Sequence, residues 1–108
     1  MITNALIVKV EHRQKPAKSG EAQYFPETVS IHCFFERKAK RLRTKERDEV
    51  MAQAHVLLPS KADVVVGDRV TLRPVLHSAD VDGETYVVLD VSWVWGRPTK
   101  ELYLEELA

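Results

Sequence analysis

Residues 85–95 alternate apolar and polar positions more regularly than any other part of the chain. A period of two is the spacing of a β-strand, because successive side chains of a strand point to opposite faces. One predicted face carries Val87, Leu89, Val91, Trp93 and Trp95, and the other carries Tyr86, Val88, Asp90, Ser92 and Val94. Asp82-Gly83 precedes the segment and is a strong turn signal. The sequence therefore predicts a strand that the chain enters through a tight turn.

The same alternation recurs along the chain. Further strands are expected at 5–10, 29–36, 49–58, 69–76 and 100–107. Pro74 lacks a backbone donor, which predicts an edge position or a bulge at that point. In the last segment Leu102 and Leu104 suit a strand while the residues after them suit a helical tail, and we favour the strand. Because no long amphipathic helix is evident, the pattern predicts an all-β, mainly antiparallel fold, either a small barrel or a sandwich with long loops.

Length and charge limit the classes of protein that the chain can belong to. With 108 residues it is long enough for one core and too short for two, so a single domain spanning 1–108 is expected. Its 16 basic and 16 acidic residues balance, which argues against a globally basic nucleic-acid binder.

The sequence also indicates where the protein is found. Cys33 is the only cysteine, so a reducing compartment is expected. No signal sequence is indicated, and no run approaches the roughly 20 apolar residues that cross a bilayer, so we expect a soluble protein without membrane contact.

Two polar segments interrupt the predicted strands. The first, 12–28, holds two prolines and a glycine without usable periodicity, so an excursion or loop is expected there. Its aromatic residues Tyr24 and Phe25 are candidates for pinning it to the body or for an interface. The second, 37–47, carries seven basic residues and lacks an apolar stripe that could anchor a helix. These residues are Arg37, Lys38, Lys40, Arg41, Arg43, Lys45 and Arg47. We predict an exposed loop or the tip of a long hairpin.

The sequence contains no recognisable catalytic centre. Cys33 falls on the apolar face of its predicted strand, where a free cysteine acts as a small hydrophobe, and no G-x-S-x-G motif occurs. His32 and Cys33 are adjacent and project to opposite faces, so they cannot readily share a metal ion. The four glycines are isolated from one another, so no phosphate-binding loop can be written. We therefore expect a protein that is not an enzyme and binds neither a metal nor another cofactor.

The basic run and the tryptophans are the candidate contact residues. Like charges crowded within 37–47 repel one another unless a negative partner relieves them, and phosphate is the obvious partner. The alternative is a solvated loop that is balanced by the acidic C-terminal residues or by a neighbouring subunit. Trp93 continues an apolar strand face and is expected in the core. Trp95 lies near the strand end and suits the core and an interface equally.

Three motifs follow one another in the second half of the chain. They are Ala54-His55-Val56-Leu57-Leu58-Pro59, Val66-Gly67-Asp68-Arg69-Val70 and Asp82-Gly83-Glu84-Thr85-Tyr86-Val87-Val88, with the hydrophobic Val91 after them. Their order resembles that of small head-tail connector proteins of tailed bacteriophages, of the head-completion or stopper type. In that family an alanine-rich strand after a long variable loop runs into a Gly-Asp turn, and a D-G-x-x-Y-x-V strand completes a small β-barrel.

The resemblance implies a structural role in the virion neck. It implies a homo-oligomeric ring, made in the bacterial host cytoplasm, that sits between the portal or adaptor and the tail-completion proteins and helps to retain packaged DNA. The basic run would then face DNA, without reading its sequence, or reach the adjacent ring. One rival interpretation is a stand-alone OB-like nucleic-acid-binding domain that stacks bases on Tyr86 and Trp95. Another is a small enzyme or toxin whose site no motif reveals.

Overall fold

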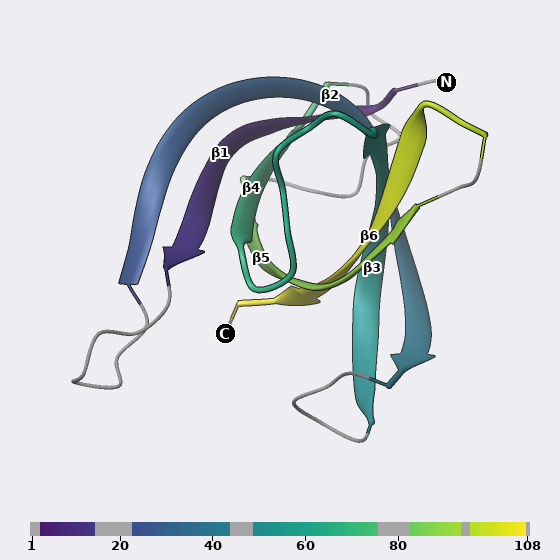
Figure 1. The fold of residues 1–108 in the computed structure, drawn as a ribbon. Helices are drawn as coiled ribbons and strands as arrows, with labels where there is room; N and C mark the ends of the chain where they lie inside the picture. Colours follow the sequence, from purple (N-terminus) through teal and green to yellow (C-terminus); the bar gives the residue numbers. More distant parts are fainter. Residues whose placement is uncertain (1–2, 15–22, 44–48, 76–82, 94–95, 108) are drawn as a thin grey trace.

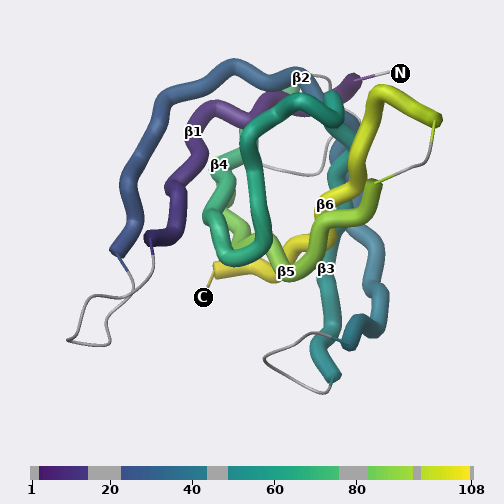
Figure 2. Tube along the Cα trace, in the orientation of Figure 1, coloured from purple at the N-terminus to yellow at the C-terminus, as the bar shows by residue number. Residues whose placement is uncertain are grey.

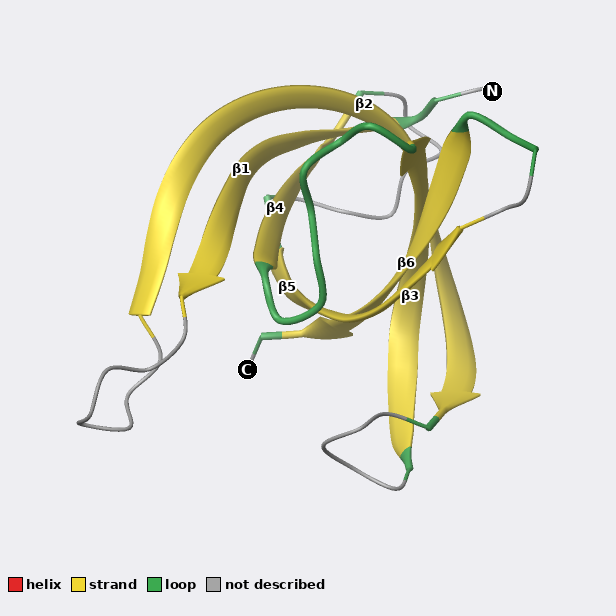
Figure 3. Cartoon of the chain, in the orientation of Figure 1, coloured by secondary structure: helices red, strands yellow, loops and turns green. Residues whose placement is uncertain are grey.

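The computed structural model describes residues 3–14, 23–43, 49–75, 83–93 and 96–107, and these form a closed antiparallel barrel (Figure 1). The strands are β1 (Ala5–Gln14), β2 (Gln23–Leu42), β3 (Val50–Pro59), β4 (Arg69–Pro74), β5 (Thr85–Trp93) and β6 (Thr99–Glu106). Around the barrel they follow the order β1-β2-β3-β6-β5-β4. The all-β prediction is confirmed, and the last segment is a strand (Figure 3). Among the described residues no helix could span a membrane.

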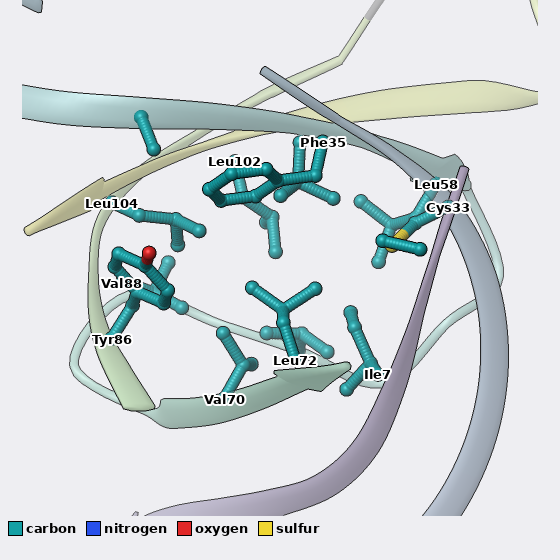
Figure 4. Close-up of a cluster of buried hydrophobic side chains, with 14 of the residues drawn as sticks. Ile7, Cys33, Phe35, Leu58, Val70, Leu72, Tyr86, Val88, Leu102 and Leu104 are labelled. Carbon is teal, nitrogen blue, oxygen red and sulfur yellow. The ribbon is translucent and has the colours of Figure 1, made fainter. Parts of the chain in front are cut away.

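The core fills the barrel with alternate residues from every strand, as the period of two requires. Ten of these side chains converge in Figure 4. They are Ile7, Cys33, Phe35, Leu58, Val70, Leu72, Tyr86, Val88, Leu102 and Leu104. A smaller cluster of Val50, Ala52, Leu89 and Tyr103, with Leu42 packed against it, joins the far end of the β2–β3 hairpin to β5 and β6.

The length of β2 gives the molecule its shape. This strand has 20 residues, and it pairs with β1 along its first part and with β3 only from Phe34 onward. Each end of β2 therefore lies in a hairpin that extends away from the barrel (Figures 1 and 2). We call them the β1–β2 arm (residues 12–14 and 23–26) and the β2–β3 arm (residues 37–43 and 49–53).

The two polar segments differ from their predictions. Residues 12–14 belong to β1 and 23–28 belong to β2, so the predicted excursion is wrong for these parts, while 15–22 lie outside the described residues. Residues 37–42 are strand, so the loop alternative is wrong for them and the long-hairpin alternative holds. Periodicity failed here because residues 12–14, 23–28 and 37–42 are exposed or only partly buried, so these stretches need no apolar alternation.

The register of β5 changes inside the strand. Its pairing with β6 shifts between Val88 and Asp90, where Leu89 forms a bulge. Tyr86 and Val88 are the core residues before the bulge. The prediction that Trp93 lies in the core is wrong, because Trp93 is the last residue of β5 at the barrel rim and 63% exposed.

Asn4 extends the ladder that β1 begins. It is buried, its Nδ2 donates to the Phe35 carbonyl at 3.0 Å, and its Oδ1 accepts from the Phe35 N–H at 2.7 Å. Asn4→Ala leaves both buried groups unpaired, so we expect the free energy of unfolding to fall by about 2 kcal/mol. Urea denaturation measures this change. Gln14→Ala, at an exposed strand end, is the control, and an equal effect of both substitutions would contradict the prediction.

Candidate interaction surfaces

Arg37 is an internal tie of the barrel. Its guanidinium donates to Glu106 Oε1 at 2.7 Å and to Glu84 Oε2 at 2.8 Å. The hydrogen bond with Glu106 raises the pKa of Arg37, burial opposes this increase, and the hydrogen bond with Glu84 adds to it. Tyr86 donates its hydroxyl hydrogen to Glu84 from inside the core. Arg37 thus connects β2 with the start of β5 and the end of β6. Both terminal nitrogens of its guanidinium donate hydrogen bonds.

Arg37→Ala is expected to destabilise the barrel by about 1 kcal/mol, because it removes a two-carboxylate tie whose members are partly exposed to solvent. Thermal unfolding at low and high salt measures the loss, which should shrink as salt screens the pairs. Lys38→Ala, one residue away and exposed, is the matched control. If Arg37→Ala left the unfolding temperature unchanged at low salt, the tie would carry no stability.

Two further residues of the basic run are also bound within the chain. Lys40 Nζ lies 2.9 Å from the Tyr103 hydroxyl and 4.3 Å from the centre of its ring. This hydrogen bond raises the pKa of Lys40. Arg41 Nε lies 2.6 Å from Oε1 of Glu49, the residue directly before β3. These contacts shape the β2–β3 arm and reduce its free charge.

Lys38 and Arg43 remain available for a partner. Both are exposed, and within the described ranges neither makes an ion pair or side-chain hydrogen bond. Lys45 and Arg47 lie outside the described residues. The seven predicted contact residues therefore divide into three that are engaged internally, two that are open and two that the structure does not describe.

Residues 60–68 cross one end of the barrel and are called the capping segment here (Figure 3). Val64 inserts into the core. The buried Lys100 ammonium donates to the Ala62 carbonyl, and the Val64 carbonyl lies 3.3 Å away. Burial lowers the pKa of Lys100. The ring of Trp93 covers this ammonium, with 4.7 Å between Nζ and the ring centre. Trp93 thus seals Lys100 and presents its other face to solvent.

Asp68 ties the capping segment to the β1–β2 arm. It is 1% exposed, and its carboxylate accepts the N–H groups of Arg13 at 3.0 Å and Val65 at 3.1 Å. Asp68 Oδ2 also lies 3.3 Å from His12 Nδ1, and the other ring nitrogen of His12 lies 2.9 Å from Glu27 Oε2. The imidazole therefore bridges two carboxylates from different elements. These contacts join β1, β2 and the capping segment, and we call the arrangement the clamp.

The clamp predicts a pH-dependent stability. Burial lowers the pKa of His12, but the hydrogen bond to Glu27 and the charge of Asp68 outweigh it, so that the pKa is raised overall. The stabilisation is therefore fully present below the unfolded pKa of about 6.5 and is lost as pH rises through the higher folded value. We expect the urea midpoint to fall between about pH 6 and pH 8. His12→Gln should remove this slope, whereas His32→Gln, on exposed β2, should retain it.

The three residues predicted as interface candidates, Tyr24, Phe25 and Trp95, do not form one site among the described residues. Arg69 stacks over Tyr24, with 3.8 Å between its guanidinium carbon and the ring centre, so Tyr24 is held against the barrel. Phe25 is 48% exposed on the arm, and Trp95 lies outside the described residues.

A shallow open pocket of about 450 Å³ lies beside the ion pairs of Arg37. It is lined by Glu84, Thr85, Glu106 and Leu107.

The described residues offer no obvious reaction chemistry. Cys33 is buried, and burial raises the pKa of its thiol to about 12, so it is not a thiolate at neutral pH. No three or more His, Cys, Asp or Glu side chains of the described ranges are placed to hold a metal ion. The chain matches no protein-family model, no curated protein and no solved structure.

Proposed function

We propose that the chain is a structural connector subunit of a tailed bacteriophage, of the head-completion or stopper type, which forms a ring between the portal or adaptor and the tail-completion proteins. In this role it helps to retain packaged DNA in the virion neck. The proposal joins the motif resemblance in the second half of the chain to the shape of the described structure.

The observation that carries the proposal is the length of β2. A barrel that served only as a compact body would need strands of about 5–10 residues, whereas β2 has 20 and continues into both arms. The arms leave the barrel on different sides (Figure 2). A subunit between two other rings must contact partners above and below while it packs sideways against its own copies. Two projecting hairpins on one rigid barrel supply such separate contacts.

The charges of the β2–β3 arm refine this role. Three of the basic residues are satisfied within the chain, so only Lys38 and Arg43 of the described arm remain to meet phosphate. Two charges per subunit bind DNA weakly, and the contact is multiplied when subunits are arranged in a ring. We therefore expect the isolated subunit to bind DNA poorly.

Two tests of the connector role are the presence of a portal gene beside the coding sequence and co-expression with that portal protein. We expect the two proteins to co-purify and electron microscopy to reveal rings stacked on the portal. Absence of portal, capsid and tail genes from the neighbourhood of the coding sequence, or failure to co-purify with that portal, would contradict the proposal.

The rival OB-like function is tested by fluorescence anisotropy of labelled single-stranded DNA at low salt. Tight binding by the monomer that is abolished in Lys38→Glu/Arg43→Glu would favour the rival and overturn the connector role as the main function. Lys61→Glu is the matched control, because Lys61 is an exposed lysine on the capping segment, away from the arm. The connector role predicts only weak, salt-sensitive binding.

A further inference from the structure

Within the part of the chain that the structure describes, two strands of the barrel have edges without a partner strand. On β2, residues 23–32 pair with β1 on one side, and pairing with β3 on the other side begins only at Phe34. On β5, pairing with β4 covers residues 85–87, and Val88 bonds the backbone of Gly67 and Asp68. The following residues, 90–93, pair with β6 alone among the described strands. Each edge therefore offers a row of backbone donors and acceptors to another strand.

The two edges lie on different sides of the molecule. In Figure 1 the free stretch of β2 runs along the left, and the end of β5 lies toward the right, beside the start of β6. They cannot meet within one chain, but the β2 edge of one copy can meet the β5 edge of the next. Such a contact joins two different surfaces and is head-to-tail, which generates a ring when the rotation closes.

The side chains of the two edges match in one antiparallel register. Placing Val29 opposite Trp93 also places Ile31 opposite Val91, so that the apolar residues of both strands share one face. Val29, Ile31 and Val91 are already packed against the core from that face. The exposed Trp93 ring would then be covered by the neighbour, as expected for an aromatic residue that anchors an interface.

The polar residues fit the same register. His32 stands opposite Asp90, which allows a charge-assisted hydrogen bond, and Ser30 stands opposite Ser92. A shift by two residues places Glu27 opposite Trp93 and removes the His32–Asp90 pair. A shift by one residue turns the apolar side chains to opposite faces. Pro26, which cannot donate to a ladder, lies outside the matched residues.

We infer that copies of this chain assemble by edge pairing, in which residues 29–32 of β2 in one copy pair antiparallel with residues 90–93 of β5 in the next. The barrels of adjacent copies are then joined through one continuous sheet. This contact rests on the proposed function, because it takes the connector ring to be built from copies of this chain.

Disulfide trapping tests the register directly. Ser30→Cys and Ser92→Cys replace opposed exposed residues by near-isosteres, and the native Cys33 is buried and stays a thiol. Mild oxidation of the double variant at millimolar concentration should give a ladder of covalent multimers on non-reducing gels. A mixture of the two single variants should stop at a covalent dimer containing one of each. Ser30→Cys/Met51→Cys, with Met51 exposed on β3, is the out-of-register control and should give no ladder.

Each outcome decides between named contacts. Covalent dimers of Ser30→Cys alone would show that β2 pairs with β2 around a two-fold axis and would overturn the head-to-tail contact. A double variant that stays monomeric, or that cross-links no better than the Met51 control, would overturn edge pairing altogether. Rings on the portal without the Ser30–Ser92 cross-link would leave the connector role standing and remove only this contact. A ladder of covalent multimers from a protein that does not bind the portal would support the edge contact and overturn the connector role.

Discussion

Replacing Leu102 with alanine is expected to lower the free energy of unfolding by about 3 kcal/mol, the range measured for fully buried leucines. Leu102 is fully buried, and it stands between Val56 of β3 and Val91 of β5. Its side chain fills the barrel where β6 joins its two neighbours, so truncation leaves a cavity that neighbouring strands of a closed sheet cannot collapse into. Urea denaturation followed by far-UV circular dichroism should show a lower midpoint with an unchanged slope.

Leu107→Ala is the matched control for this substitution. Leu107 follows directly after β6 and is 43% exposed, so its truncation should change the free energy of unfolding by less than about 0.5 kcal/mol. Equal losses from the two substitutions would mean that the interior of the barrel is not packed as described. A change in slope for Leu102→Ala would instead indicate that unfolding no longer occurs in a single step.

The strands of the barrel body were predictable because each buries one face. Residues 50–58 alternate between buried and accessible positions without a break, and the sequence displays that period directly. Pro74 was expected at an edge or bulge, and it is the last residue of β4, opposite Ala5. Closure into a barrel rather than a sandwich depends on pairing between distant strands, which local alternation does not encode.

The arms and the bulge were not predictable by the same means. Residues 37–41 are exposed on the β2–β3 arm and show a run of charge where a strand lies, while Leu42 and the opposite residues Val50 and Ala52 join the smaller buried cluster. The bulge at Leu89 moves the core line from Tyr86 and Val88 to Val91, so the predicted core face is wrong before the bulge, whereas the error for Trp93 follows from its position at the rim. Bulges are set by the curvature that closure requires, which is a property of the whole sheet.

Only some of the polar contacts could be predicted from the sequence. Asp68 belongs to the Gly-Asp motif, and its carboxylate accepts the Val65 N–H three residues before it, a local bond of the kind that aspartate forms in turns. Its bonds to His12 and Arg13 span more than fifty residues, so no local pattern indicates them. Lys100 follows a Pro-Thr turn and looks like an ordinary surface lysine, yet its ammonium lies under Trp93. Buried polar groups that hydrogen-bond to the backbone of a loop can be identified only from the folded structure.

Asp68 is the residue on which the barrel cap most depends. Its buried carboxylate satisfies two backbone N–H groups and faces the imidazole of His12, and thereby fixes the capping segment to β1. The segment in turn supplies the carbonyls that receive Lys100 and inserts Val64 into the core. Loss of the carboxylate therefore affects β1, the capping segment and, through Lys100, β6.

Asp68→Ala should consequently lower the free energy of unfolding by about 3 kcal/mol, since it leaves two backbone donors and the imidazole of His12 without their acceptor. Urea denaturation measures the loss, and the pH slope assigned to His12 should weaken together with it, because the imidazolium keeps only the exposed Glu27. Asp63→Ala is the control, as Asp63 is exposed on the same segment, and should stay within about 0.5 kcal/mol of the wild type. Asp68→Asn retains one acceptor oxygen and should fall between the two. If Asp68→Ala were as stable as Asp63→Ala, the capping segment would be held by Val64 and Lys100 alone, and the carboxylate would be dispensable.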